Sequence, residues 1–215
     1  MTLPDEEFIE EARSLEAAYL QSDDPIVQSG FSGGRDRWVA ERSPIISAID
    51  GDGDFLDVGC ANGVLAADVV VWAGQRGHTI VPHGVDLGEG LIELARQHLA
   101  EHATNFTVAD AWRWEPQRRW RYVYSLLDLA PEDLWCEWIE KLLGWVESGG
   151  RLIIGSYGSR SHEIEPVDVA EVLARCGMEV VGAASGGDPP VSRFAWAVRN
   201  DPRIQSSSGG ARARV

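Results

Sequence analysis

Residues 55–70, FLDVGCANGVLAADVV, join an apolar run to a helical pattern through a short turn that contains an acid, an asparagine and two glycines. Gly59 lets the chain leave a strand sharply, and Gly63 lets the following helix approach closely, so we expect backbone N–H groups to face a ligand. Asp57 lies inside the strand end, where a carboxylate would bind an ammonium group or the loop amides and repel a pyrophosphate. The turn therefore predicts a site for a positively charged nucleoside.

Strand-like and helical patterns alternate on either side of this turn, which is typical of an α/β fold with helices on both faces of a mostly parallel sheet. The last two apolar runs are separated only by GGDPPV, residues 186–191, which is too short for a helical crossover and predicts an antiparallel pair. We therefore expect a doubly wound, seven-stranded sheet. Its strands are predicted at 55–60, 80–87, 106–110, 122–129, 151–157, 179–185 and 193–199, and its helices at 63–75, 89–102, 131–146 and 165–176.

The first 50 residues show helical patterns without the strand-like runs of the rest of the chain. Phe8, Ala12, Leu15 and Tyr19 recur at helical spacing among acidic residues, and a second helical pattern follows a glycine-rich loop and bends at Ser43-Pro44. The tail after residue 200 has the composition of a disordered end. We predict three parts: a helical lid over residues 1–50, a ligand-binding domain over 51–200, and a disordered tail over 201–215.

Length and charge limit the classes of partner. The chain has 215 residues, enough for one sizeable core, and a formal net charge of −15, which disfavours nucleic acid and anionic membranes. No apolar run approaches the roughly 20 residues that span a bilayer. The three cysteines lack metal-binding spacing, and the acidic N-terminus is unlike a signal peptide, so we expect a cytoplasmic protein with reduced thiols and a small-molecule partner.

Both common phosphate motifs fail at the turn. A dinucleotide fingerprint needs glycine at positions 59, 61 and 64, where the chain has Gly59, Ala61 and Val64, and a Gly-Lys-Ser/Thr loop is absent. The pattern D-x-G-x-A-x-G instead resembles the first motif of the class I S-adenosylmethionine-dependent methyltransferases, from which it departs only at Ala61. The segment GFSGGRDRW, residues 30–38, also resembles small methyltransferases of the actinobacterial type.

The resemblance covers roughly residues 54–199 and implies S-adenosyl-L-methionine as the cofactor. It places Asp86 against the ribose hydroxyls and Asp110 at the adenine amino group, beside Ala111 and Trp112. The other residues that it implies at the cofactor are Asp57, Gly59, Cys60, Ala61, Asn62, Gly63, Leu87 and Ser125. Three acids at three successive strand ends make a coherent site. Simpler interpretations are a helix N-cap for Asp86 and a solvated loop acid for Asp110.

The resemblance implies methyl transfer to the oxygen or nitrogen of a small molecule, mainly through proximity and in-line alignment. The sequence identifies no catalytic residue; Asp128, Tyr157 and His162 are candidate bases by position. SLLDLAP, residues 125–131, lacks the Asn/Asp-Pro-Pro-Tyr motif of enzymes acting on planar amines, which disfavours adenine or glutamine as acceptor. Substrate-binding residues are predicted at Tyr19, Trp38, Arg42, Asp128 and Tyr157, although Trp38 also suits the core.

Two alternatives remain for the function: a non-catalytic module that binds S-adenosylmethionine, and an oxidoreductase that uses a nicotinamide.

Three other patterns are weak indications of a calcium site, a zinc site and a nucleic-acid surface. DGDGD, residues 50–54, lacks the glycine and glutamate of a calcium loop, and His98 with His102 lacks a third zinc ligand. The tryptophan-rich and arginine-rich residues 112–121 could stack on a single strand, but the acidity of the whole chain argues against nucleic acid. No metal is predicted.

Overall fold

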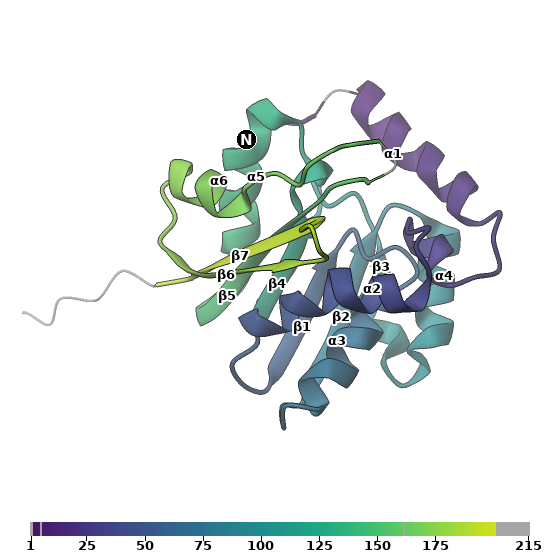
Figure 1. Ribbon diagram of the computed structural model, residues 1–215, viewed down its shortest axis with the longest axis horizontal. Coiled ribbons are helices and arrows are strands. Elements are labelled where there is room, and N and C mark those ends of the chain that lie inside the picture. Colours follow the sequence, from purple (N-terminus) through teal and green to yellow (C-terminus); the bar gives the residue numbers. More distant parts are fainter. Residues whose placement is uncertain (1, 5, 161, 201–215) are drawn as a thin grey trace, which may run out of the picture.

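The protein is described here by a computed structural model, in which residues 2–4, 6–160 and 162–200 are placed. Its centre is a seven-stranded sheet in the order β3-β2-β1-β4-β5-β7-β6 (Figure 1). Neighbours are parallel from β3 to β5, and β7 is antiparallel to both β5 and β6, as predicted. The strands are β1 (Gly53–Val58), β2 (Ile80–Asp86), β3 (Phe106–Val108), β4 (Trp120–Leu126), β5 (Val146–Tyr157), β6 (Val180–Gly186) and β7 (Ser192–Val198).

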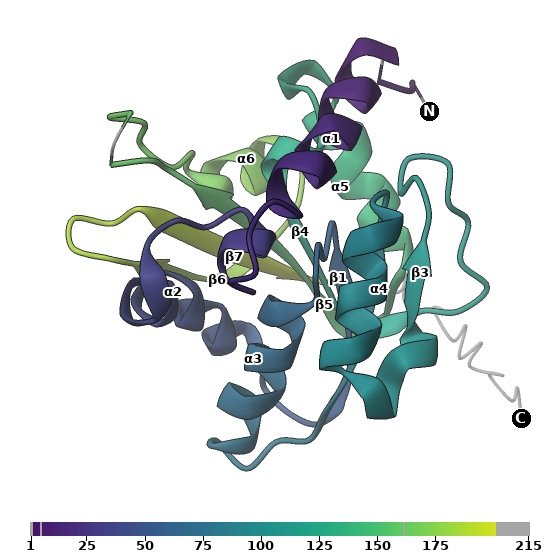
Figure 2. The same cartoon turned by 90° about the vertical axis from the view of Figure 1, so that its right-hand side faces the viewer.

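Helices cover both faces of the sheet. One face carries α2 (Gly34–Arg42), α3 (Val64–Gly74) and α4 (Glu89–His98), and the other carries α5 (Trp135–Gly144) and α6 (Val169–Arg175) (Figure 2). The 3-10 turns are η1 (Val27–Ser29), η2 (Ser43–Ala48), η3 (Ala100–Asn105), η4 (Leu127–Leu129) and η5 (Glu132–Leu134). Three predicted helices are shorter than expected. The chain changes to 3-10 geometry after His98, η5 precedes α5, and Asp168 caps α6 with its side chain.

The first 50 residues divide between two locations. Helix α1 (Glu6–Tyr19) lies across the carboxyl ends of the central strands, where Ile9 joins the apolar cluster beneath α5 (Figure 2). Helix α2 ends at Arg42 and the chain restarts as η2, as the Ser43-Pro44 pair predicted. Trp38, Ile45 and Ile46 pack into the core with strand residues. Helix α1 therefore lies over the edge of the sheet, whereas residues 34–49 contribute to the core.

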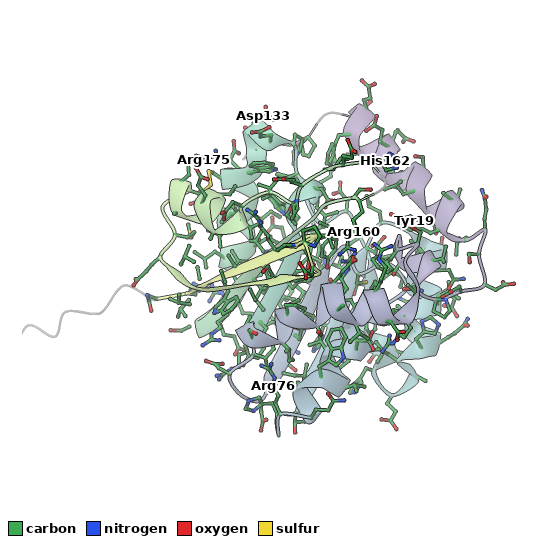
Figure 3. The ribbon with its side chains drawn as sticks, in the orientation of Figure 1. Tyr19, Arg76, Asp133, Arg160, His162 and Arg175 are labelled. Atoms are coloured by element: carbon green, nitrogen blue, oxygen red, sulfur yellow. A yellow bond between two sulfur atoms is a disulfide. The ribbon has the colours of Figure 1, made fainter. Side chains whose placement is uncertain are left out.

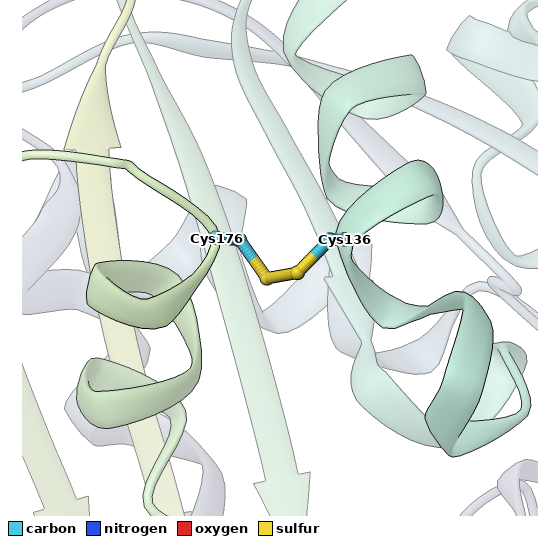
Figure 4. Close-up of a disulfide and its surroundings, with 2 residues drawn as sticks. All are labelled: Cys136 and Cys176. Atoms are coloured by element: carbon cyan, nitrogen blue, oxygen red, sulfur yellow. A yellow bond between two sulfur atoms is a disulfide. The ribbon is translucent and has the colours of Figure 1, made fainter.

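A disulfide joins Cys136 in α5 to Cys176 just after α6, with a Cα–Cα distance of 5.1 Å (Figure 4). The expectation that the cysteines are all reduced is therefore wrong. Forty positions separate the two residues in sequence, and they approach only because α5 and α6 cover the same face of the sheet. Cys60 is a free, buried thiol.

The structure bears on the predictions for a membrane span, for the tail and for the arginine-rich segment. In the described part of the chain, no helix combines the length and apolar character needed to cross a bilayer. The disordered tail predicted for residues 201–215 lies outside the described residues. The tryptophans of the arginine-rich segment belong to the core: Trp112 and Trp120 are each 3% exposed, so their rings are not available for stacking on a nucleic acid.

Candidate active site

Two adjoining cavities lie at the carboxyl ends of the central strands, where ligands bind in open parallel sheets. The first, here called the β2 cavity, measures about 540 Å³ and lies between α1 and the ends of β2 and β3. The second, the β5 cavity, measures about 670 Å³ and lies between α2 and the ends of β1, β4 and β5. Tyr19, Gly59, Ala61 and Asp128 line both cavities, so the two form one continuous site.

The glycine turn forms the floor between the cavities. Gly59 has a φ of +78°, and a Cβ there would lie 2.5 Å from Leu129 Cδ1. Gly63 has a φ of +75°, and a Cβ there would lie 3.0 Å from Ala95 Cβ in α4. Ala61, the departure from the family motif, also has a positive φ of +45°. An alanine in this left-handed region is strained, so the turn retains the geometry of the motif at an energetic cost.

The amides of this turn do not point into the site, contrary to expectation. Gly59 N and Cys60 N both donate to Val85 O of β2, at 2.8 and 3.2 Å, and Gly63 N donates to Cys60 O. Ala61 N donates to Asp86 Oδ2 at 2.8 Å. These four N–H groups are satisfied within the fold, so the small residues offer a close approach to the backbone and not a set of free donors.

Asp57 supplies a buried carboxylate to the β5 cavity. It is 2% exposed at the end of β1, and burial, followed by the nearby charge of Asp86, raises its pKa to about 8. No donor of the described residues stabilises its ionised form. An uncompensated buried acid is costly, and a cationic ligand in the cavity would relieve that cost.

Asp86 ends β2 at the wall of the β2 cavity. Its Oδ1 accepts a hydrogen bond from Gly88 N at 2.9 Å, just before α4, while its Oδ2 binds Ala61 N. Burial raises the pKa of Asp86, and the hydrogen bonds from the two amides oppose that shift. Asp86 thus holds the glycine turn and the residue before α4 in place. It is not the N-cap of α4, which is Gly88 and has no side-chain capping bond, so the helix-capping interpretation is wrong; its carboxylate lines the β2 cavity.

Asp110, just beyond β3, also lines the β2 cavity. Its Oδ1 accepts from Trp112 N at 2.9 Å, and its Oδ2 pairs with the Arg113 guanidinium. The Trp112 ring stacks on Trp138 at 4.6 Å between centroids, and its Nε1 donates to Leu129 O. With Leu87 and Ala111, these residues give one end of the cavity an apolar, aromatic wall.

Three residues implied at the cofactor do not line either cavity. Asn62 is fully buried and donates through Nδ2 to Pro25 O at 2.7 Å, which ties the turn to the segment after α1. Gly63 is buried against α4, and Ser125 is buried where its hydroxyl accepts from Trp138 Nε1. Cys60 does line the β5 cavity, where burial raises the pKa of its thiol.

The five residues predicted to bind substrate come together in the β5 cavity. Tyr157 Oη lies 2.7 Å from Tyr124 Oη, and Arg42 lies over the Tyr157 ring, 3.4 Å from its centroid. Burial raises the pKa of Tyr157, of Tyr19 and of Asp128, although Asp128 as a whole residue is exposed. Trp38 fits both the core and the substrate-binding interpretation, because it is 3% exposed and also lines the cavity. The third candidate base, His162, is exposed and lines neither cavity.

Sequence reasoning missed several residues of the site. Arg160 follows β5 and lines the β5 cavity; it lies on the same side of the molecule as Tyr19, far from Arg76 (Figure 3). Phe31 and Tyr124 form further aromatic walls there, and Glu16 of α1 lines the β2 cavity. The strand alternation at Tyr124 and the placement of Arg160 just after a strand were the available signals, but neither specifies which side chains converge.

The architecture is similar to that of solved methyltransferases. The N-methyltransferase NodS of Bradyrhizobium japonicum WM9, in complex with S-adenosyl-L-homocysteine, is 14% identical, with a TM-score of 0.67 over 88% of this chain and 99% of that one. Magnesium protoporphyrin IX methyltransferase (ChlM) of Synechocystis PCC 6803, with bound SAM, is 16% identical, with a TM-score of 0.61 over 93% and 100% of the two chains. The chain has the fold of these methyltransferases.

A third structure of this fold extends the comparison. The DhpI-SAM-HEP complex is 16% identical, with a TM-score of 0.63 over 92% of this chain and 100% of that one. No protein-family model and no curated protein matches the sequence. At these identities the likeness concerns the fold, and the site residues of this chain must carry any argument about function.

Proposed function

We propose that this protein transfers a methyl group from S-adenosylmethionine to a small-molecule acceptor. The observation that carries the proposal is the convergence of Asp57, Asp86 and Asp110 on one continuous site, at the ends of three neighbouring strands. The three similar structures named above, two of them methyltransferases and all of them holding SAM or S-adenosyl-L-homocysteine, support it.

The residues present suit such a cofactor. Asp86 would accept hydrogen bonds from the ribose hydroxyls, and Asp110 with Ala111 and Trp112 would receive the adenine. The unpaired carboxylate of Asp57 would attract the ammonium group, and the close approach allowed by Gly59 would accommodate the amino-acid chain. When bound, S-adenosylmethionine supplies an electrophilic methyl group on a sulfonium centre.

The chain would contribute orientation and exclusion of water. Helix α1 covers the β2 cavity, and the aromatic walls of the β5 cavity would align an acceptor oxygen or nitrogen with the methyl group. Asp128 lines both cavities, and its raised pKa suits a proton acceptor at their junction. We propose Asp128 as the residue that receives a proton from the acceptor where one must be lost.

Binding and turnover test the proposal separately. Calorimetry should show S-adenosylhomocysteine binding with NAD much weaker, and incubation of S-adenosylmethionine with candidate acceptors should release S-adenosylhomocysteine. Tight NAD binding would favour the nicotinamide oxidoreductase. Cofactor binding with no turnover on any acceptor would favour the non-catalytic module.

Asp86→Ala is expected to weaken S-adenosylhomocysteine binding by about 10-fold to 100-fold, because a charge-assisted hydrogen bond contributes about 1.5–3 kcal/mol. Asp52→Ala is a matched control: Asp52 also accepts from a backbone amide, Thr79 N at 2.7 Å, but it lies at the opposite end of the strands. An unchanged dissociation constant for Asp86→Ala would leave this residue with a structural role only.

The cytoplasmic location remains a prediction from sequence. The Cys136–Cys176 disulfide argues against it, because such bonds are rare in reducing compartments.

A further inference from the structure

Arg42, the last residue of α2, is a buried cation at the wall of the β5 cavity. Its side chain is 7% exposed, and its Nη1 is buried without a hydrogen-bond partner among the described residues. In the described part of the chain, one carboxylate oxygen lies within 4 Å of this guanidinium, Glu41 Oε2 at 3.8 Å from Nη1. Glu41 is already engaged through its other oxygen by Arg37 Nε at 3.1 Å.

Aromatic rings surround the guanidinium. The Arg42 Cζ atom lies 3.4 Å from the Tyr157 ring centroid, 4.7 Å from that of Phe31 and 5.3 Å from that of Trp38. Rings over its faces fix the plane of a guanidinium and leave only its N–H edge for hydrogen bonding. A planar oxyanion is the group that matches such an edge, and burying the edge unpaired is costly.

The position of Arg42 places this edge on the acceptor side of the site. Arg42 stacks on Tyr157 at the end of β5, and β4 separates β5 from β1. Two strand spacings, about 10 Å, therefore lie between β5 and the strand that carries Asp57 and the glycine turn. Asp86, proposed at the ribose, is one strand further away on β2.

We propose that the β5 cavity binds a methyl acceptor that carries a carboxylate beside a planar, aromatic group, and that Arg42 binds this carboxylate. The proposal rests on the methyl transfer proposed above and specifies its substrate class. Phe31, Trp38, Tyr124 and Tyr157 provide the walls for the planar group. Arg37 and Arg160 line the same cavity and balance the charges of Glu41 and Asp128, so Arg42 adds one positive charge, which a singly charged carboxylate would neutralise.

The test uses benzoate and 4-hydroxybenzoate as probes, with benzamide and 4-hydroxybenzamide as neutral partners of the same shape. Binding is followed by protein NMR titration, both with and without saturating S-adenosylhomocysteine. We expect each carboxylate to bind at least tenfold more tightly than its amide and to perturb residues of the β5 cavity. Equal affinity for acid and amide, or no binding of either acid, would overturn the proposal.

Three variants identify the residue responsible. Arg42→Gln should abolish the preference for the acid, and Arg42→Lys should retain part of it because it keeps the charge but not the planar fork. Arg76→Gln is the control: this arginine donates through Nη1 to Ile46 O at 3.1 Å and lies outside the lining of both cavities, so the variant should keep the full preference. If Arg42→Gln fails to fold, the Arg42→Lys variant and the wild-type preference still decide the matter.

A second arm separates the acceptor from the cofactor, whose amino-acid part also carries a carboxylate. Arg42→Lys should bind S-adenosylhomocysteine and 5′-methylthioadenosine, which lacks that part, within threefold of the wild type. A loss of more than tenfold for S-adenosylhomocysteine alone would assign Arg42 to the cofactor and overturn the proposal. Failure of the wild type to bind S-adenosylhomocysteine would instead count against the proposed function. The preference for the carboxylate probes would still be measurable, because those titrations are also run without S-adenosylhomocysteine.

Discussion

At the scale of single residues, Asp57 is the group whose environment departs most from that of an exposed carboxylate. Its pKa rises from an ordinary 3.8 to about 8. Between these pH values the unfolded chain carries the charge while the folded protein holds the proton. The contribution of Asp57 to the free energy of unfolding is therefore fully present below about pH 4 and is lost as pH rises towards 8. The slope contributed by this one group is at most about 1.4 kcal/mol per pH unit.

Asp57→Asn should therefore be more stable than the wild type, and its advantage should grow with pH and level off above about 8. Urea unfolding of both proteins at pH 5, 6, 7 and 8 measures that difference, in which the contributions of all other groups cancel. An advantage that does not change with pH would contradict the raised pKa of Asp57.

In the wild type, S-adenosylhomocysteine binding at pH 7 should also release close to one proton, because the ammonium group would favour the ionised form of Asp57. Calorimetry in buffers of different ionisation enthalpy measures this release, and the Asp57→Asn variant should release none.

Ala61 is the second residue with a specific cost. Its φ of +45° lies in the left-handed region, which costs a side-chain-bearing residue about 1–2 kcal/mol relative to glycine. Ala61→Gly should therefore raise the free energy of unfolding by about 1 kcal/mol, after allowance for the greater freedom of glycine in the unfolded chain. Chemical denaturation tests this, and a destabilised variant would mean that the methyl group packs usefully at the junction of the cavities.

At the scale of elements, α1 connects the fold to the proposed chemistry. It lines the β2 cavity along one side, and Glu16 Oε1 accepts a hydrogen bond from Gly90 N of α4 at 2.7 Å. This bond joins α1 to the helix that follows Asp86. The lid stays a prediction from sequence, and we place it at α1, because α2 and η2 belong to the core and α2 also lines the β5 cavity.

Deleting residues 1–22 should abolish methyl transfer while lowering S-adenosylhomocysteine affinity by no more than about tenfold, because the three acids remain and water is no longer excluded. Glu16→Gln should weaken closure in the same direction, whereas Glu10→Gln, which alters an exposed pair with Arg13, should not. Hydrogen exchange should show α1 gaining protection when cofactor and acceptor are both present. Full turnover by the truncated protein, or equal protection without ligand, would reduce α1 to a packing element.

At the scale of the whole molecule, the Cys136–Cys176 disulfide links two helices across 40 positions of sequence. Closing a loop of that length in the unfolded chain stabilises the folded protein by about 2–4 kcal/mol. Cys136→Ser/Cys176→Ser should therefore lower the free energy of unfolding by about that amount, and reductant should have the same effect on the wild type only. Intact mass after alkylation in denaturant without reductant should show one free thiol, Cys60, which is buried in the native protein. Three alkylated cysteines under these conditions would contradict the bond.

The sequence alone determined the order of the elements and the direction of most strands. Apolar periodicity and turn residues are local properties, so the alternation from Asp54 onward and the short link at residues 186–191 sufficed for a parallel sheet with an antiparallel end. The same local signals placed Asp57, Asp86 and Asp110 at strand ends. Carboxyl ends of parallel strands share one edge, so their meeting in one site could be anticipated.

Only the tertiary structure decided which side chains meet and in what environment. The burial of Asp57, the stacking of Arg42 on Tyr157, and the approach of Cys136 to Cys176 each depend on packing between elements that lie far apart in the chain. The same is true of the turn amides, which were expected to face a ligand and instead bond to Val85 and Asp86 of the neighbouring strand. Desolvation and hydrogen-bond partners are set by three-dimensional neighbours, and a periodic pattern carries no information about them.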